Sequence, residues 1–500
     1  MTPYRDEVFA TADGPLRSLI DVALAAVDEA RAARSGPVAV GGPQASVAYA
    51  ASALPANLLP EHADDPEAAF RALIESYAAW AIDVNHPGSV ARMQCPPTAA
   101  SVAADLVASL LNQSLHTWES GPFALELEKR VVAAVTELAG YGPGAGGTVT
   151  SGGSMSNIMA MLLARDAVLG KRFGVSISGE GYAAVKGRPM VASTRSTHFS
   201  VGRGMSITGL GEDSLIELPT DARGRMIPEK VDEMLRSLPE DQIPVMMIAC
   251  AGATDLGWVD PLPELAEICR NLGIWLHSDA AYGGGMLFSA KLRDKLHGIE
   301  ESDSITLDMH KFGWTPASAS FLIVRDAATL APLGRQATSL NAPDDVAEGF
   351  IGLYGVSTQA TRRSDALKIA ATFAVLGREG LGAMVDACHD LAVHAAATIQ
   401  DTPCLDLSAP PELSTVLFRY VPDGADPEGD TVSVFNADLR RELMRQGKGL
   451  LARVWVTRPS GVRAAYLKFT LLNPATTPAE IDQLVADVVQ TADALAAGRA

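Results

Sequence analysis

Between residues 147 and 324, short apolar segments alternate with segments of helical periodicity, and this alternation limits the fold more than any other feature. Apolar strands separated by helices are typical of a largely parallel sheet with helices on both faces. We therefore expect an α/β fold whose ligands bind beyond the carboxyl ends of the strands. The expected strands are Gly147–Thr150, Met190–Ser193, Val245–Ala249, Ile274–His277, Ser304–Leu307 and Ser320–Val324, and the expected helices between them are Ser156–Asp166, Glu229–Ser237 and Leu262–Leu272.

The flanking segments predict a helical arm before this region and a small α+β domain after it. Thr477 with Glu480 three residues later marks the start of a last helix. We expect an N-terminal helical arm at residues 1–100, a large domain at 101–370 and a small C-terminal domain at 371–500. The supporting segments are helices at 15–34, 69–82 and 98–111, strands at Thr415–Tyr420 and Ala465–Leu472, and a helix within 474–494.

Composition argues against several classes of protein. The net charge of −19 disfavours binding to nucleic acid or to an anionic membrane. No apolar run reaches the roughly 18 residues of a membrane span, and residues 1–10 lack the apolar core of a secretory signal. The five cysteines are scattered without a CxxC pair or metal-ligand spacing. We expect reduced thiols, no metal site and a cytoplasmic location.

The segment Thr150–Asn157 has two adjacent glycines between an expected strand and an expected helix. Glycine lets the backbone approach a ligand closely, and a helix N-terminus offers free N–H groups and a positive dipole end. With the hydroxyl of Ser154 beside Gly153, the loop is a candidate phosphate site. A flexible strand–helix turn has the same residues, so this pattern alone does not decide between the two interpretations.

Three further side chains are placed near the ends of expected strands. Asp279 follows the strand ending at His277, where a carboxylate pairs with a cationic ring nitrogen or simply caps a turn. Lys311 follows the strand Ser304–Leu307, where an amine forms an imine with an aldehyde cofactor or remains a surface lysine. His198 lies in a loop after an earlier strand, where an imidazole packs on a ring or serves the structure only.

Taken together, these features meet the needs of an anchored pyridine aldehyde. The phosphate must be held, the ring must be sandwiched, and the aldehyde carbon must meet an amine. A nearby carboxylate keeps the ring nitrogen protonated, so that the ring remains an electron sink. The combination predicts an enzyme that uses pyridoxal 5′-phosphate (PLP) on an amino acid, with Lys311 carrying the cofactor.

At these residues the sequence resembles the group II PLP-dependent amino acid decarboxylases. The resemblance is more detailed with the bacterial 2,4-diaminobutyrate and siderophore-type lysine decarboxylases, and it covers roughly residues 80–490. The segments that carry it are Asn112–Leu115, Leu127–Glu128, Thr150–Asn157, His198–Val201, Trp275–Gly284, Asp308–Lys311, Leu340–Asn341, Asp344–Asp345, Thr361–Lys368 and Leu471–Pro474, with Trp118.

This resemblance implies a fold-type I PLP enzyme, aspartate-aminotransferase-like, that works as a homodimer with active sites at the subunit interface. It implies a carboxy-lyase that releases CO2 and an amine from an L-amino acid. Lys311 is then the Schiff-base lysine, Asp279 the partner of the ring nitrogen, and His198 a catalytic residue stacked on the ring. The other implied contacts are Ala281 on the second ring face, Gly153 and Ser154 at the phosphate with His310 close by, Thr254 near the ring oxygen, and Thr98 and His116 towards the substrate.

Three positions depart from the family pattern. In the family a tyrosine on a loop after the lysine protonates the substrate carbon, and its position here is Ser339, a much poorer acid. Members without this tyrosine divert the reaction to oxygen and release an aldehyde, so decarboxylation-coupled oxidative deamination stays open beside simple decarboxylation. Arg92 replaces a histidine and is either a substrate contact or a surface ion-pair member, and His116 replaces an aspartate. A non-catalytic homologue is a third alternative.

Overall fold

The computed structural model describes residues 14–62, 65–334, 343–458 and 460–498. The chain divides into a large unit of residues 95–387 and a small unit that joins residues 1–94 with 388–500. Helix α13 (Ala366–Gln400) passes from the first into the second, with non-helical backbone at Gly377 (φ 59°). The N-terminal helices thus share a unit with the C-terminal sheet. The three-part division at residues 100 and 370 stays a prediction.

A seven-stranded sheet forms the centre of the large unit, in the order β1-β7-β6-β5-β4-β2-β3. All neighbours are parallel except β7, which runs antiparallel to both β6 and β1. The expected largely parallel α/β fold is confirmed, as are the six expected strands; only the short β3 was not predicted. The strands are β1 (Gly146–Thr150), β2 (Arg188–Ser193), β3 (Leu215–Glu217), β4 (Gln242–Cys250), β5 (Trp275–Ala280), β6 (Ser304–Asp308) and β7 (Ser320–Val324).

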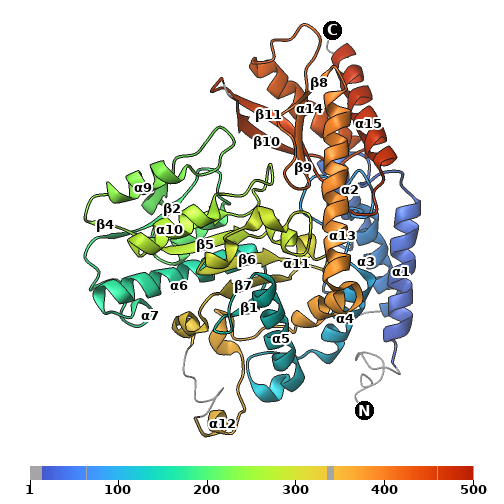
Figure 1. Cartoon of the computed structure of the whole chain (residues 1–500). Coiled ribbons are helices and arrows are strands. Elements are labelled where there is room, and N and C mark those ends of the chain that lie inside the picture. The colour runs from blue at the N-terminus through green and yellow to red at the C-terminus, as the bar shows by residue number, and fades with distance from the viewer. Residues whose placement is uncertain (1–13, 63–64, 335–342, 459, 499–500) are drawn as a thin grey trace. The chain divides into compact units, whose positions relative to one another are not determined.

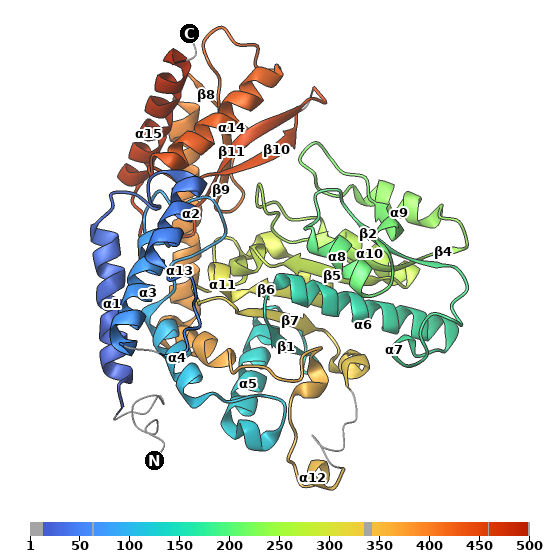
Figure 2. The same cartoon turned by 180° about the vertical axis from the view of Figure 1, so that it is seen from behind.

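Helices cover this sheet on both sides, with α6 on one side and α10 on the other (Figures 1 and 2). Helix α6 begins directly after β1 and buries Met159 and Leu163 in one cluster with Val191 and Met246 of the strands. Burying such side chains stabilises the fold by roughly 1.5–3 kcal/mol each. The helices are α4 (Ala99–Leu111), α5 (Pro122–Leu138), α6 (Gly153–Phe173), α7 (Ile177–Glu180), α8 (Ser200–Ile207), α9 (Pro228–Arg236), α10 (Leu262–Leu272), α11 (Met309–Phe312) and α12 (Pro343–Ala347).

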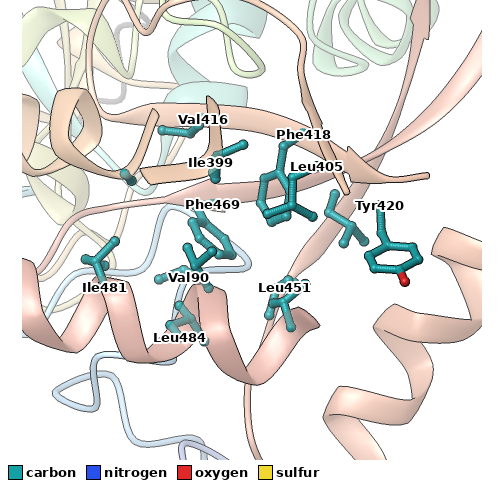
Figure 3. Close-up of a cluster of buried hydrophobic side chains, with 14 of the residues drawn as sticks. Val90, Ile399, Leu405, Val416, Phe418, Tyr420, Leu451, Phe469, Ile481 and Leu484 are labelled. Carbon is teal, nitrogen blue, oxygen red and sulfur yellow. The ribbon is translucent and has the colours of Figure 1, made fainter. Parts of the chain in front are cut away.

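The small unit contains an antiparallel four-stranded sheet in the order β10-β11-β9-β8. Its apolar core includes Phe418 of β9, Phe469 of β11 and Leu484 of α15 (Figure 3). Thr477 and Glu480 form the expected capping box at the start of α15. The elements are α1 (Leu16–Ala32), α2 (Gly42–Ala53), α3 (Pro66–Trp80), β8 (Leu405–Leu407), β9 (Thr415–Tyr420), α14 (Asp430–Arg445), β10 (Ala452–Thr457), β11 (Arg463–Thr470) and α15 (Pro478–Ala497).

Within the described ranges, no helix combines the length and the apolar character needed to cross a bilayer.

Candidate active site

A cavity of about 420 Å³ lies in the large unit, where the parallel strands β4, β5 and β6 end. Ligands of such sheets bind at this edge, because several loops and helix N-termini converge there. Eight residues singled out in the sequence line the cavity, and the fold brings them together from segments far apart in the chain. They are Gly153, Ser154, His198, Thr254, Asp279, Ala281, His310 and Lys311.

Lys311 lies on the short helix α11 that follows β6, and its amine is part of an ion pair. Its Nζ is 2.9 Å from Oδ2 of Asp308, the last residue of β6. The other carboxylate oxygen of Asp308 accepts a hydrogen bond of 2.6 Å from Ser320 Oγ at the start of β7. Nε2 of His310 lies 3.5 Å from the same carboxylate. A primary amine is therefore held at the cavity by a nearly buried carboxylate.

The turn from β1 into α6 lines the cavity with its backbone. A Cβ atom on Gly153 would lie 3.2 Å from Ala281 Cβ and from both carboxylate oxygens of Asp308, so a side chain would crowd this cradle. The first turn of α6 also has backbone N–H groups that no residue of the helix can accept from. The cradle and the helix N-terminus together fit the phosphate of PLP.

Asp279 lies on β5 itself, because the strand continues to Ala280 instead of ending at His277 as expected. Its Oδ1 accepts from the backbone N–H of Ala281 at 3.1 Å, and its Oδ2 accepts from Asn157 Nδ2 at 2.8 Å. Both oxygens are thus held in place at the cavity. A carboxylate fixed in this way fits the partner of a protonated pyridine nitrogen.

His198 lies just before α8, and its ring lines the cavity. Nδ1 is 2.8 Å from Ser200 Oγ and accepts from the backbone N–H of Ser200 at 3.3 Å. Burial lowers the pKa of the imidazole, although the charge of Asp279 opposes this effect. A neutral ring fits packing on a cofactor face.

Two of the four residues expected near the substrate, Thr98 and His116, are not among the described residues that line the cavity. Thr98 is the N-cap of α4, where its Oγ1 accepts from Ser101 N at 3.3 Å. The ring nitrogens of His116 lie 2.6 Å from Ser114 Oγ and 3.4 Å from Ser120 Oγ. Arg92 belongs to the small unit, and Ser339 lies outside the described residues.

Three residues of the site escaped the analysis of the sequence. Asn157 and Asp308 each contact a predicted site residue, and Cys250 lines the cavity at the end of β4. Burial raises the pKa of the Cys250 thiol well above its ordinary value, so the group is neutral. Asn157 and Asp308 lie within the quoted motifs, yet only the fold shows which atoms they contact. The described residues contain no group of three or more His, Cys, Asp or Glu side chains arranged to hold a metal ion.

Residues 55–421 match the family model described as the pyridoxal-dependent decarboxylase conserved domain. The chain belongs to this family. Two relatives are L-2,4-diaminobutyrate decarboxylases. The protein of Rhizobium meliloti is 40% identical, and the match covers 82% of this chain and 79% of the relative. The protein of Acinetobacter baumannii is 34% identical, and the match covers 85% of this chain and 84% of the relative. The chain is accordingly a PLP-dependent amino acid carboxy-lyase, as the sequence predicted.

Solved structures agree with this assignment. The glutamate decarboxylase domain of the diaminobutyrate-pyruvate transaminase and L-2,4-diaminobutyrate decarboxylase from Vibrio parahaemolyticus superposes with a TM-score of 0.83. It is 28% identical, and the match covers 97% of each chain. Mouse CSAD superposes with a TM-score of 0.84 at 25% identity, over 95% of this chain and 98% of its own.

Proposed function

We propose that this decarboxylase acts on L-2,4-diaminobutyrate and that Lys311, Asp279 and His198 are its catalytic residues. The observation that carries the assignment of the site is the convergence of the Lys311 amine, the Asp279 carboxylate and the Gly153 cradle on one cavity of about 420 Å³. The substrate is supported by the two relatives that carry this name at 40% and 34% identity. The cysteine sulfinic acid and aromatic amino acid decarboxylases among its relatives are 28% identical.

Each side chain has a distinct task in this proposal. Lys311 attaches the cofactor through its amine, and the N-terminal turn of α6 at Gly153 and Ser154 holds the phosphate. Asp279 keeps a proton on the ring nitrogen by charge pairing. When bound, the cofactor supplies an electron sink for the electron pair left behind by CO2. His198 and Ala281, which line the cavity, would pack on the two ring faces, and Thr254 would lie near the ring oxygen.

The test combines a substrate panel with a lysine variant. Purified protein is loaded with PLP, and CO2 release is measured from L-2,4-diaminobutyrate, L-ornithine, L-lysine, L-glutamate, L-cysteine sulfinate and L-tryptophan. We expect the highest kcat/KM with L-2,4-diaminobutyrate. Lys311→Ala should abolish both CO2 release and the borohydride-reducible attachment of cofactor, whereas Lys171→Ala at the exposed end of α6 should retain both. If the enzyme prefers a substrate of another class, the substrate assignment is wrong. If the cofactor attaches to another lysine, the assignment of the site is wrong.

We also propose that the enzyme works as a homodimer in the cytoplasm, with the active sites at the interface. Helix α4 exposes Val102, Leu106 and Leu110 on one face, and Phe123 nearby in sequence is 76% exposed. Exposed apolar patches mark interaction sites, and these side chains support the proposed subunit interface. Light scattering should give twice the chain mass for the wild type, and Leu106→Glu should shift the mass towards that of one chain. The five cysteines all lie in the described residues and form no disulfide, which suits a reducing compartment.

Direct substrate contacts of Arg92, Thr98, His116 and Ser339 stay predictions. Their test is the ratio of kcat/KM for L-2,4-diaminobutyrate and L-glutamate in single alanine variants. A residue that contacts the substrate side chain should change this ratio, whereas one that only supports the fold should lower both values together.

A further inference from the structure

A buried hydrogen-bond network connects the two sides of the cofactor cavity through Asn157 of α6. Asn157 is 1% exposed. Its side chain contacts residues on strands β5 and β6 and on helix α8. Nδ2 donates to Asp279 Oδ2 at 2.8 Å and to Ser200 Oγ at 3.0 Å. Oδ1 lies 3.0 Å from His277 Nε2 and accepts from Thr306 Oγ1 at 3.1 Å. All four hydrogen-bonding positions of the amide are thus in use.

The chemistry of the partners allows only one orientation of this amide. A carboxylate only accepts hydrogen bonds, so the amide atom next to Asp279 must be the nitrogen. The oxygen then faces His277, whose Nε2 must carry a proton in order to donate. Burial lowers the pKa of His277 to about 4, so the ring is neutral and its Nδ1 is an acceptor.

The far end of the network agrees with this arrangement. Nδ1 of His277 is 2.8 Å from Ser304 Oγ, which itself accepts a 2.8 Å hydrogen bond from Trp275 Nε1. The indole N–H is a donor only. Ser304 therefore has its own proton available for His277. The three residues are all buried on β5 and β6, where water cannot replace a missing partner.

The side-chain amide of Asn157 also determines, through Ser200, which ring nitrogen of His198 carries the proton. Because Nδ2 of Asn157 donates to Ser200 Oγ, the hydroxyl proton of Ser200 is available for His198 Nδ1 at 2.8 Å. The backbone N–H of Ser200 points to the same ring nitrogen at 3.3 Å. Two donors at Nδ1 leave it unprotonated. A neutral His198 then carries its proton on Nε2.

We propose that Asn157 is a positioning residue that holds the Asp279 carboxylate and, through Ser200, fixes His198 as the Nε2–H tautomer. His198 therefore offers a hydrogen-bond donor to the cavity and cannot accept a proton at Nε2. A role for this histidine as a general base at Nε2 is excluded by the arrangement. The protonation of His198 does not depend on which amino acid is the substrate.

The test is the tautomer of His198 in the PLP-loaded enzyme, read by nitrogen NMR after labelling the histidines with ¹⁵N. The chain has nine histidines, so the His198 signals are assigned by their loss in His198→Gln. We expect a single neutral state with the proton on Nε2 at pH 7. Proton on Nδ1, or a charged ring, would overturn the proposal.

Two variants and a matched control separate positioning from a general structural effect. Ser200→Ala and Asn157→Asp should each give His198 a measurable fraction of the Nδ1–H tautomer. Ser156→Ala makes the same chemical change next to Asn157, but its hydroxyl bonds Thr150 Oγ1 and Phe321 O outside the network. This control should keep the wild-type tautomer. An unchanged tautomer in Asn157→Asp would overturn the proposal, and should Ser200→Ala fail to fold, the wild-type and Asn157→Asp spectra still decide.

Discussion

Oδ2 of Asp308 lies 2.9 Å from Nζ of Lys311, so the amine proposed to attach the cofactor is ion-paired with its own chain. The carboxylate side chain is 3% exposed, and this burial limits screening by solvent. The amine must leave this ion pair before it can form an imine with an aldehyde. The same carboxylate faces the Gly153 cradle, where a phosphate would meet its negative charge.

Asp308→Asn should therefore speed the uptake of PLP. Removing the carboxylate releases the amine and removes repulsion of the phosphate, and a change of about 1.4 kcal/mol in the barrier corresponds to tenfold in rate. The measurement is the rate at which the bound-cofactor absorbance appears after PLP is mixed with apoenzyme. The control is Asp344→Asn on α12, an exposed carboxylate that does not line the cavity. Slower uptake in Asp308→Asn would show that the carboxylate assists attachment.

Asp279→Asn should retain much of the bound cofactor and lose at least about a hundredfold in kcat. The contacts at the lysine and at the phosphate remain, whereas a neutral amide no longer keeps the ring nitrogen protonated. The bound cofactor is measured by absorbance, and kcat is measured as CO2 release in a coupled assay. Wild-type turnover in this variant would exclude Asp279 as the ring partner.

Asp260 should make the stability of the large unit fall as pH rises. Its carboxyl accepts from Met226 N at 2.9 Å and Cys250 N at 2.7 Å, and burial raises its pKa to about 6. The unfolded value is about 3.9, so its stabilising contribution is complete below that pH and is lost as pH rises through 6. The loss is at most about 3 kcal/mol.

The measurement compares urea unfolding of the wild type and Asp260→Asn at pH 4 and pH 7.5. Other carboxylates titrate equally in both proteins, so their effect cancels in the difference. We expect the stability of the wild type relative to the variant to decrease between the two pH values. A constant or increasing difference would contradict the raised pKa.

Ser339→Tyr should lower the yield of aldehyde relative to amine. General acid catalysis is worth roughly 10²–10⁴ in rate, so the proposed place of Ser339 at the position of the family's proton donor predicts a leak towards an oxygen-dependent product. Amine, aldehyde and peroxide are measured with and without oxygen for both proteins. If the wild type makes amine alone and the substitution changes nothing, another group supplies the proton.

Much of the fold, and the convergence of eight of the predicted site residues on one cavity, were predictable from the sequence. Each predicted strand is a short apolar run, and the residues Gly153, Asp279 and Lys311 lie at the ends of such runs, so that a parallel sheet must bring them to one edge. The small β3 was missed because Leu215–Glu217 is too short to show a period.

The polar contacts inside the site could not be predicted in the same way. Asn157 donates a hydrogen bond to Asp279, which lies 122 positions later in the chain. Nothing in the local pattern of α6 shows which strand the Asn157 side chain contacts. The same holds for Asp308, whose partner Ser320 lies across an antiparallel pair. Side-chain partners depend on register, and register appears only when the strands are paired.

The antiparallel strand β7 has a consequence for the order in which the enzyme forms during synthesis. It pairs Thr150 with Ser320, so the strand that leads into the phosphate-binding turn finds its neighbour only 170 positions later. At roughly 5–20 residues per second on the ribosome, β1 waits roughly 10–35 seconds with its edge unpaired. A nascent chain in this interval exposes the unpaired backbone edge of β1, and the cofactor has no complete cavity to bind until Ala317, which lines it shortly before β7, has emerged.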